Sequence, residues 1–72
     1  MRIQVACNDG RPCALYLGSR WLYVLQIIER AEEGSSQRFR VKVADGRVFL
    51  LDRDLASGDW RLASVKRTVN SP

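Results

Sequence analysis

The stretch that decides the fold is residues 38–52, which read Arg-Phe-Arg-Val-Lys-Val-Ala-Asp-Gly-Arg-Val-Phe-Leu-Leu-Asp. Basic and apolar residues alternate from Arg38 to Ala44, which is the period of a strand with one buried face. Asp45-Gly46 is the typical sequence of a two-residue hairpin turn, and a second apolar run follows it. The sequence therefore predicts a β-hairpin centred on Asp45-Gly46.

A two-residue turn also sets the register of this hairpin. We expect Ala44 opposite Arg47 and Val43 opposite Val48, so that one apolar face, extended by Phe39, points into the core. The opposite face then carries four cations and two large apolar side chains, namely Arg38, Arg40, Lys42, Arg47, Phe49 and Leu51. This mixed face is predicted to be exposed to solvent.

Turn signals outside the hairpin divide the rest of the chain into further short strands. The predicted strands are Ile3–Cys7, Cys13–Leu17, Trp21–Glu33, Arg38–Ala44, Arg47–Asp52 and Trp60–Val65. The segment 21–33 fits a helical period as well as a strand period. We interpret it as a strand because Trp, Tyr, Val and Ile favour strands, with a helical turn at its acidic end as the alternative. Gly34–Gln37 is interpreted as a flexible connector.

These elements predict an all-β fold. We expect a five- to six-stranded antiparallel meander that curls into a small barrel or a strongly bent sheet, because closure limits the exposed edges. A chain of 72 residues supports one domain. That domain is expected over residues 1–66, followed by a flexible tail over residues 67–72. Trp21 and Trp60 lie among aliphatic neighbours and are predicted to anchor the core.

The composition excludes most catalytic chemistry. The chain has no histidine, which excludes Ser–His and Cys–His catalysis and histidine-ligated metals. Cys7 and Cys13 lack the C-x-x-C spacing and are predicted to be reduced thiols, with a redox role left open. Asp52, Asp54 and Asp59 are assigned to turns and caps. We therefore predict a non-enzymatic protein without cofactor or metal.

Apolar runs are too short for a signal peptide or a membrane span. The longest, Cys13–Leu17 and Trp21–Leu25, have five residues each. We expect a cytoplasmic domain without membrane contact, present as a monomer or a weak dimer.

The net charge of +4, with ten arginines among the twelve cations, favours an anionic partner. Cations two residues apart on a strand are spaced by about 7 Å, which is close to the phosphate spacing of a single nucleic-acid strand. The candidate nucleic-acid-binding residues are therefore Arg38, Arg40, Lys42, Arg47 and Phe49, with Phe49 stacking a base of single-stranded or primer-template DNA.

Two alternatives remain for this face. It is a plain solvated surface if the arginine stems only cover Phe49 and Leu51. In the other alternative, the protein is an adaptor that docks on a partner protein through a sheet edge or an apolar patch.

The order of turns and aromatic residues gives a further indication. The segments Asp9–Pro12, Gly18–Val24, Ile27–Glu29, Phe39–Val41, Asp45-Gly46, Leu50–Asp54 and Ser57–Leu62 together resemble a small bacterial domain of unknown function. That family occurs alone and near the C-terminus of Y-family DNA-polymerase-like mutagenesis proteins. The resemblance covers residues 9–66 and implies a link with DNA repair and damage tolerance, with a DNA-repair protein as a partner. It transfers no catalytic residue, and Ala31 stands where the family has a tryptophan.

Overall fold

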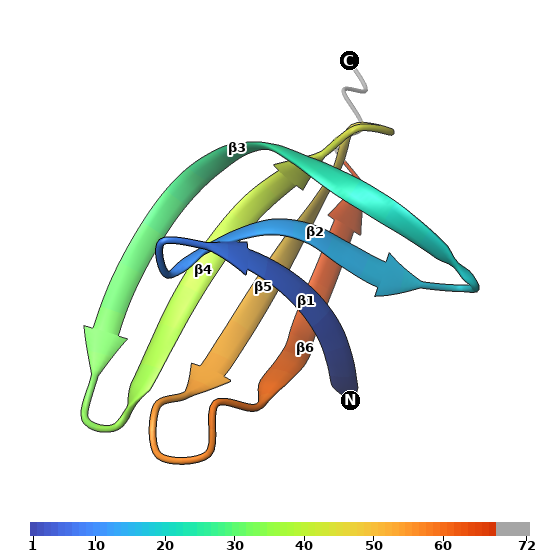
Figure 1. Ribbon diagram of the computed structural model, residues 1–72. Coiled ribbons are helices and arrows are strands. Elements are labelled where there is room, and N and C mark those ends of the chain that lie inside the picture. Colours follow the sequence, from blue (N-terminus) through green and yellow to red (C-terminus); the bar gives the residue numbers. More distant parts are fainter. Residues whose placement is uncertain (68–72) are drawn as a thin grey trace.

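The computed structural model describes residues 1–67, with side chains up to Val65. It contains six antiparallel strands that follow one another around a closed barrel (Figure 1). The strands are β1 (Arg2–Asn8), β2 (Arg11–Leu17), β3 (Arg20–Glu33), β4 (Ser36–Val43), β5 (Arg47–Asp54) and β6 (Trp60–Arg67). The predicted all-β meander is confirmed. No helix long and apolar enough to cross a membrane occurs in the described part of the chain.

The long strand β3 belongs to both halves of the barrel. It pairs with β2 as far as Tyr23, and from Val24 onward it pairs with β4. Two register shifts within β3 accompany a bend that carries the strand over the top of the barrel (Figure 1). The interpretation of Trp21–Glu33 as a strand is confirmed over its full length.

Tight two-residue turns join the first four strands. Asp9-Gly10 and Gly18-Ser19 have positive φ at both positions, as type I′ hairpins require. Glu33 pairs with Ser36, so the turn between β3 and β4 consists of residues 34 and 35 alone. The flexible connector predicted for Gly34–Gln37 is therefore wrong, because its second half is already part of β4.

The hairpin of β4 and β5 exists, but its register differs from the predicted one. Lys42 pairs with Val48, and five residues connect this pair. The N–H of Ala44 donates to the carbonyl oxygen of Tyr23 on β3 at 2.9 Å, so it is not available to Arg47, and the N–H of Gly46 donates to the carbonyl oxygen of Val43 at 2.9 Å. A shift of one residue turns every side chain of a strand to the other face.

The core is formed by the inward faces of these strands. Six of its side chains have no exposed surface, namely Leu15, Phe39, Val41, Val43, Phe49 and Leu51. Trp60 is 6% exposed and packs on Phe39, with 5.5 Å between ring centroids. Trp60 is thus a core anchor, as predicted. Trp21 is 45% exposed, so its predicted core role is wrong.

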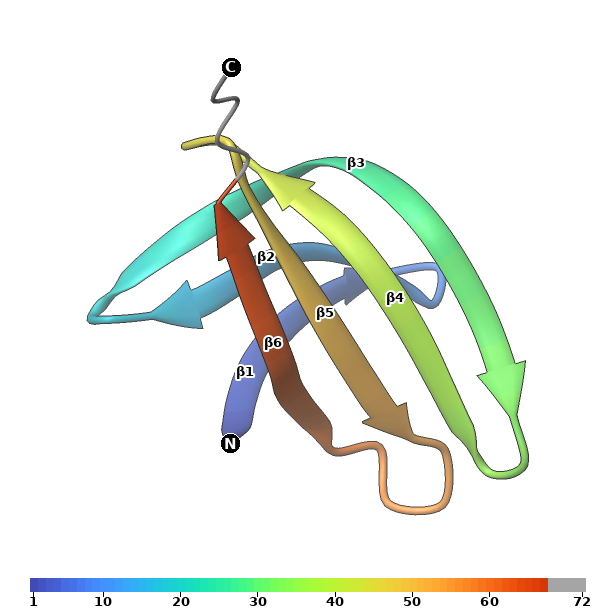
Figure 2. The ribbon, with the colours of Figure 1, turned by 180° about the vertical axis from the view of Figure 1, so that it is seen from behind.

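The barrel closes between β1 and β6, and β6 continues beyond this closure. In Figure 2, seen from behind, β4, β5 and β6 lie side by side as one wall. β6 extends to Arg67, whose backbone lies opposite Arg47. The remainder of the predicted tail, residues 68–72, lies outside the described residues.

Candidate nucleic-acid interface

Three of the predicted site residues lie on the outer side of β4. Arg38, Arg40 and Lys42 alternate with the inward residues Phe39 and Val41, as the sequence pattern indicates. Arg38 and Arg40 are exposed, and Lys42 is half-buried. This part of the predicted face therefore exists as a row of cations.

Carboxylates from both neighbouring strands neutralise two of these cations. The Nε of Arg38 donates to Oδ1 of Asp52 on β5 at 2.8 Å, and Nη1 of Arg40 lies 3.3 Å from Oε1 of Glu29 on β3. The hydrogen bond that Asp52 accepts, together with its negative charge, raises the pKa of Arg38 above its ordinary value. Around Arg38 and Arg40, positive and negative charges on the outer face of β4 are therefore close to balance. This part of the face offers little attraction to a polyanion.

Phe49 and Arg47 lie in a different environment from the predicted one. Because of the register of β5, Phe49 points into the barrel and is fully buried. The guanidinium of Arg47 lies 5.2 Å from the centroid of the Phe49 ring, and its Nε donates to Oδ2 of Asp45 at 2.8 Å. The predicted stacking of a base on Phe49 is therefore wrong, because no face of the ring reaches the surface.

The pair of Asp45 and Arg47 gives a testable pH dependence. Hydrogen bonds from the side chain and the backbone N–H of Arg47, together with the nearby charge of Arg20, lower the pKa of Asp45 below its ordinary value. A lowered folded-state pKa means that the pair stabilises the fold above the unfolded-state pKa and that this contribution is lost as the pH falls.

We expect an NMR titration of the Asp45 carboxyl group to show a midpoint below that of an ordinary aspartate, moving upward in Arg47→Ala. Arg40→Ala serves as the control and should leave this midpoint unchanged, because Arg40 pairs with Glu29 instead. A midpoint insensitive to Arg47→Ala would contradict the described turn.

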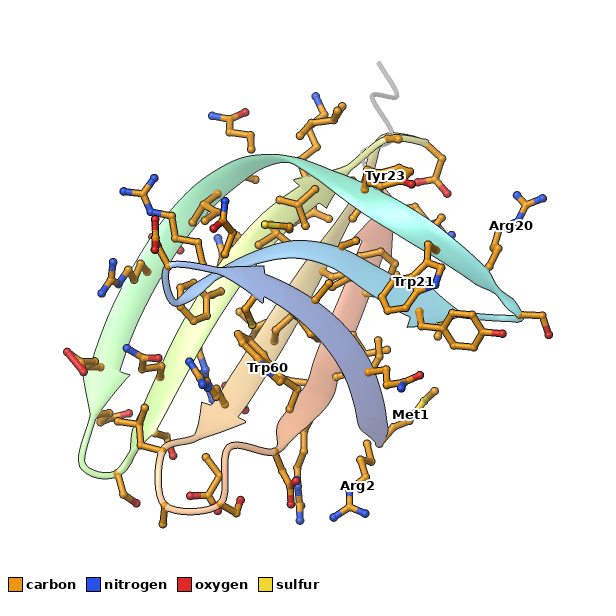
Figure 3. The ribbon with its side chains drawn as sticks, in the orientation of Figure 1. Met1, Arg2, Arg20, Trp21, Tyr23 and Trp60 are labelled. Atoms are coloured by element: carbon orange, nitrogen blue, oxygen red, sulfur yellow. The ribbon has the colours of Figure 1, made fainter. Side chains whose placement is uncertain are left out.

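Three exposed aromatic side chains, which sequence reasoning did not bring together, lie on the outer side of β2 and β3. We call Tyr16, Trp21 and Tyr23 the aromatic strip. They are 40%, 45% and 66% exposed. Tyr16 pairs with Trp21 across the two strands, and their ring centroids are 5.2 Å apart. Figure 3 shows Trp21 and Tyr23 following one another along β3, directly after Arg20.

The signal for this strip was present in the sequence. Trp21 and Tyr23 are two residues apart, so they share one face of a strand. The two-residue turn at Gly18-Ser19 then fixes Tyr16 opposite Trp21. Leu15 and Leu22 form the neighbouring inward pair and are buried. The core role predicted for Trp21 would require its side chain to point to the other face of β3, which is the face of Leu22.

The unbalanced charge of the chain gathers at the end of the barrel beside this strip. We call this the basic end, and we define it by backbone position as Arg20, Lys42, Arg47, Lys66 and Arg67. Lys42 is the last paired residue before the turn between β4 and β5, and Lys66 and Arg67 pair with the first residues of β5. Within the described chain, Asp45 is the only acidic residue that lies among these positions. The seven other cations and the seven other acids of the sequence cancel in the net charge. In the sequence, these five positions together with Asp45 account for the net charge of +4.

The aromatic strip and the basic end are continuous. Arg20 precedes Trp21 in the chain, and its charge acts on Asp45. The carbonyl oxygen of Tyr23 accepts a hydrogen bond from the N–H of Ala44 in the turn between β4 and β5. The two features are therefore neighbours at this end of the barrel.

No group of three or more metal-ligating side chains occurs among the described residues. Cys7 and Cys13 are exposed free thiols on the hairpin of β1 and β2. Comparison with known proteins gives no match to this chain among family models, curated proteins or solved structures.

Proposed function

We propose that this protein is a non-enzymatic nucleic-acid-binding module that holds single-stranded DNA on the aromatic strip and the basic end. The observation that carries the proposal is their contiguity. Exposed Trp21 and Tyr23 adjoin the end of the barrel that holds the net positive charge. Proteins that bind single strands combine these same two elements, aromatic rings for the bases and cations for the backbone.

The geometry suits an extended strand. Trp21 and Tyr23 are two residues apart on β3, which corresponds to about 7 Å. Bases of an extended single strand are separated by a similar distance, so successive bases can lie on the two rings. A duplex keeps its bases stacked on one another, and its base faces are not available to the strip.

This proposal keeps part of the site predicted from the sequence and relocates the rest. Lys42 and Arg47 remain in it, as members of the basic end. Arg38 and Arg40 are left out because Asp52 and Glu29 neutralise them. The link to DNA repair and damage tolerance, and a DNA-repair protein as a partner, rest on the family resemblance described above.

A second candidate function is a protein-interaction adaptor that uses the same strip. Leu25 continues the strip on β3 and is 64% exposed, which extends the apolar surface. Tyrosine and tryptophan are also enriched at protein interfaces. Such an adaptor would bind without a steep dependence on salt, whereas DNA binding releases counterions from the phosphates.

A salt titration tests the proposal. We expect an oligothymidylate labelled with fluorescein to bind with an affinity that falls as salt rises, with a slope of about 0.7 per phosphate neutralised on a single strand. The double variant Arg20→Ala/Lys42→Ala should flatten this slope, because both side chains belong to the basic end.

The matched control is Arg38→Ala/Arg40→Ala, which lowers the net charge by the same two units but removes cations that are already paired. It should leave the slope close to that of the wild type. Affinity weaker than about 1 mM at low salt, or a slope that responds only to the control variant, would reject the proposal.

A further inference from the structure

The closure of the barrel between β1 and β6 is short. It consists of the pairs Arg2–Arg61 and Ile3–Trp60, with the N–H of Leu62 donating to the carbonyl oxygen of Met1 at 2.7 Å. Beyond Leu62, β6 continues from Ala63 to Arg67 with β5 on one side and no paired strand on the other, within the described chain. Figure 1 shows β6 rising away from β1 on this side.

The inner surface of the barrel is open at this place. Val65 pairs with the fully buried Phe49 and therefore faces inward, yet it is 42% exposed. Leu62, next along β6, is only half-buried, and Leu17 at the end of β2 is half-buried beside Met1. On the β1 side of this region, a pocket of about 360 Å³ lies between residues 1–4 and residues 16–18. An inward apolar side chain at this exposure indicates a missing section of barrel wall.

We propose that this gap accepts an extended peptide segment of a partner protein as an additional strand. We define the gap by the free edge of β6 (Ala63–Arg67), Met1 and the turn between β2 and β3 (Leu17–Arg20). The backbone groups along the free edge of β6 supply hydrogen bonds, as in other cases of strand addition. The inward side chains of the guest strand cover Val65 and Leu17 and remove their apolar surface from water.

The surroundings of the gap determine the chemistry of the guest. β1 pairs with β6 in antiparallel fashion, and a guest strand in line with β1 has the same direction. Its N-terminal end then lies at the basic end, near Arg20 and Arg47. Asp45 already accepts a hydrogen bond from Arg47. The negative charge that balances the other cations near the gap therefore has to come from the guest strand. We therefore infer a segment that begins with acidic residues and continues with alternating apolar ones.

Charge also argues against a second copy of this chain in the gap. Pairing of two β6 edges would place the basic end of one copy against a second surface with net positive charge. The apolar side chains of Val65 and Leu17 likewise favour a peptide over a nucleic acid as the occupant of the gap.

The test uses a synthetic peptide of two glutamates followed by alternating valine and threonine. We expect it to slow amide hydrogen exchange by about tenfold or more at those amides of Ala63–Arg67 that point away from β5, because only these amides gain partners. The same peptide with alternate backbone nitrogens methylated should have no effect. Equal slowing by the methylated peptide, or no slowing at millimolar concentration, would overturn the inference.

Two charge-matched variants identify the face that the peptide uses. Val65→Asp places a carboxylate in the gap, and Ser64→Asp places the same charge on the outer side of the same edge, opposite Leu50. Peptide affinity should fall at least about tenfold in the first and change less than about twofold in the second. Val65→Thr, which is milder, serves the same purpose if Val65→Asp does not fold. Slowed exchange that depends on protein concentration without peptide would show that a second copy occupies the gap and would overturn the inference.

Discussion

Phe49→Ala is expected to destabilise the barrel by about 3–5 kcal/mol, the usual cost of truncating a fully buried phenylalanine. The ring has no exposed surface, and the variant also removes the contact between the ring and the Arg47 guanidinium. A small domain has a stability of only about 0.05–0.15 kcal/mol per residue. The variant should therefore be largely unfolded in conditions where the wild type is folded.

Urea unfolding followed by tryptophan fluorescence measures this effect, because Trp60 is buried in the folded state and becomes exposed on unfolding. Leu50→Ala is the control, since Leu50 is the next residue of β5 but points outward and is half-buried. Its cost should be about 1 kcal/mol. If Phe49→Ala were as stable as the wild type and lost only DNA binding, the described register of β5 would be wrong and Phe49 would lie on the surface.

Trp21→Ala/Tyr23→Ala is expected to produce the largest loss of DNA binding. Each base stacked on an aromatic ring contributes about 1–3 kcal/mol, so each truncation should weaken binding roughly 5- to 150-fold. Both side chains are about half exposed or more, so the cost to stability should be much smaller than for Phe49→Ala. Fluorescence anisotropy with the labelled oligothymidylate at one fixed salt concentration measures the change.

Ile28→Ala is the matched control for this variant. Ile28 is on the same strand as Trp21 and has a similar exposure of 43%, but it lies in the half of β3 that pairs with β4. Its truncation should leave DNA binding unchanged. Equal losses in both variants would mean that binding follows the general apolar surface of β3 and not the strip. If neither variant lost affinity for DNA, stacking of bases on Trp21 and Tyr23 would not contribute to binding.

Local patterns in the sequence predict the hairpin of β4 and β5, but they do not predict its register. Alternation from Arg38 to Val43 determines which side of β4 is buried, and this part is confirmed. The register of β5 depends on Ala44, whose N–H donates to the carbonyl oxygen of Tyr23 on β3 and is therefore not available to Arg47. This competition between two neighbours is a tertiary effect that a two-residue turn signal does not contain.

The candidate site shows the same limit. The sequence identifies Arg38 and Arg40 as outward cations, but their partners Asp52 and Glu29 lie on two other strands. Only the assembled sheet shows which cations are neutralised and which remain. The face on which Trp21 lies could have been predicted from the sequence, because the two-residue turn at Gly18-Ser19 places Trp21 opposite Tyr16.

The order of the strands also bears on how the chain folds. Every pair but one joins strands that are neighbours in the sequence, so hairpins can be added one after another at a small cost in chain entropy. The pairing of Arg2 with Arg61 is the exception, because it must close a loop of nearly the whole chain. We therefore expect this closure to form last during folding. In the native state it should open first, so that transient loss of the pairs of Arg2 and Ile3 widens the way into the interior without unfolding the other five pairings.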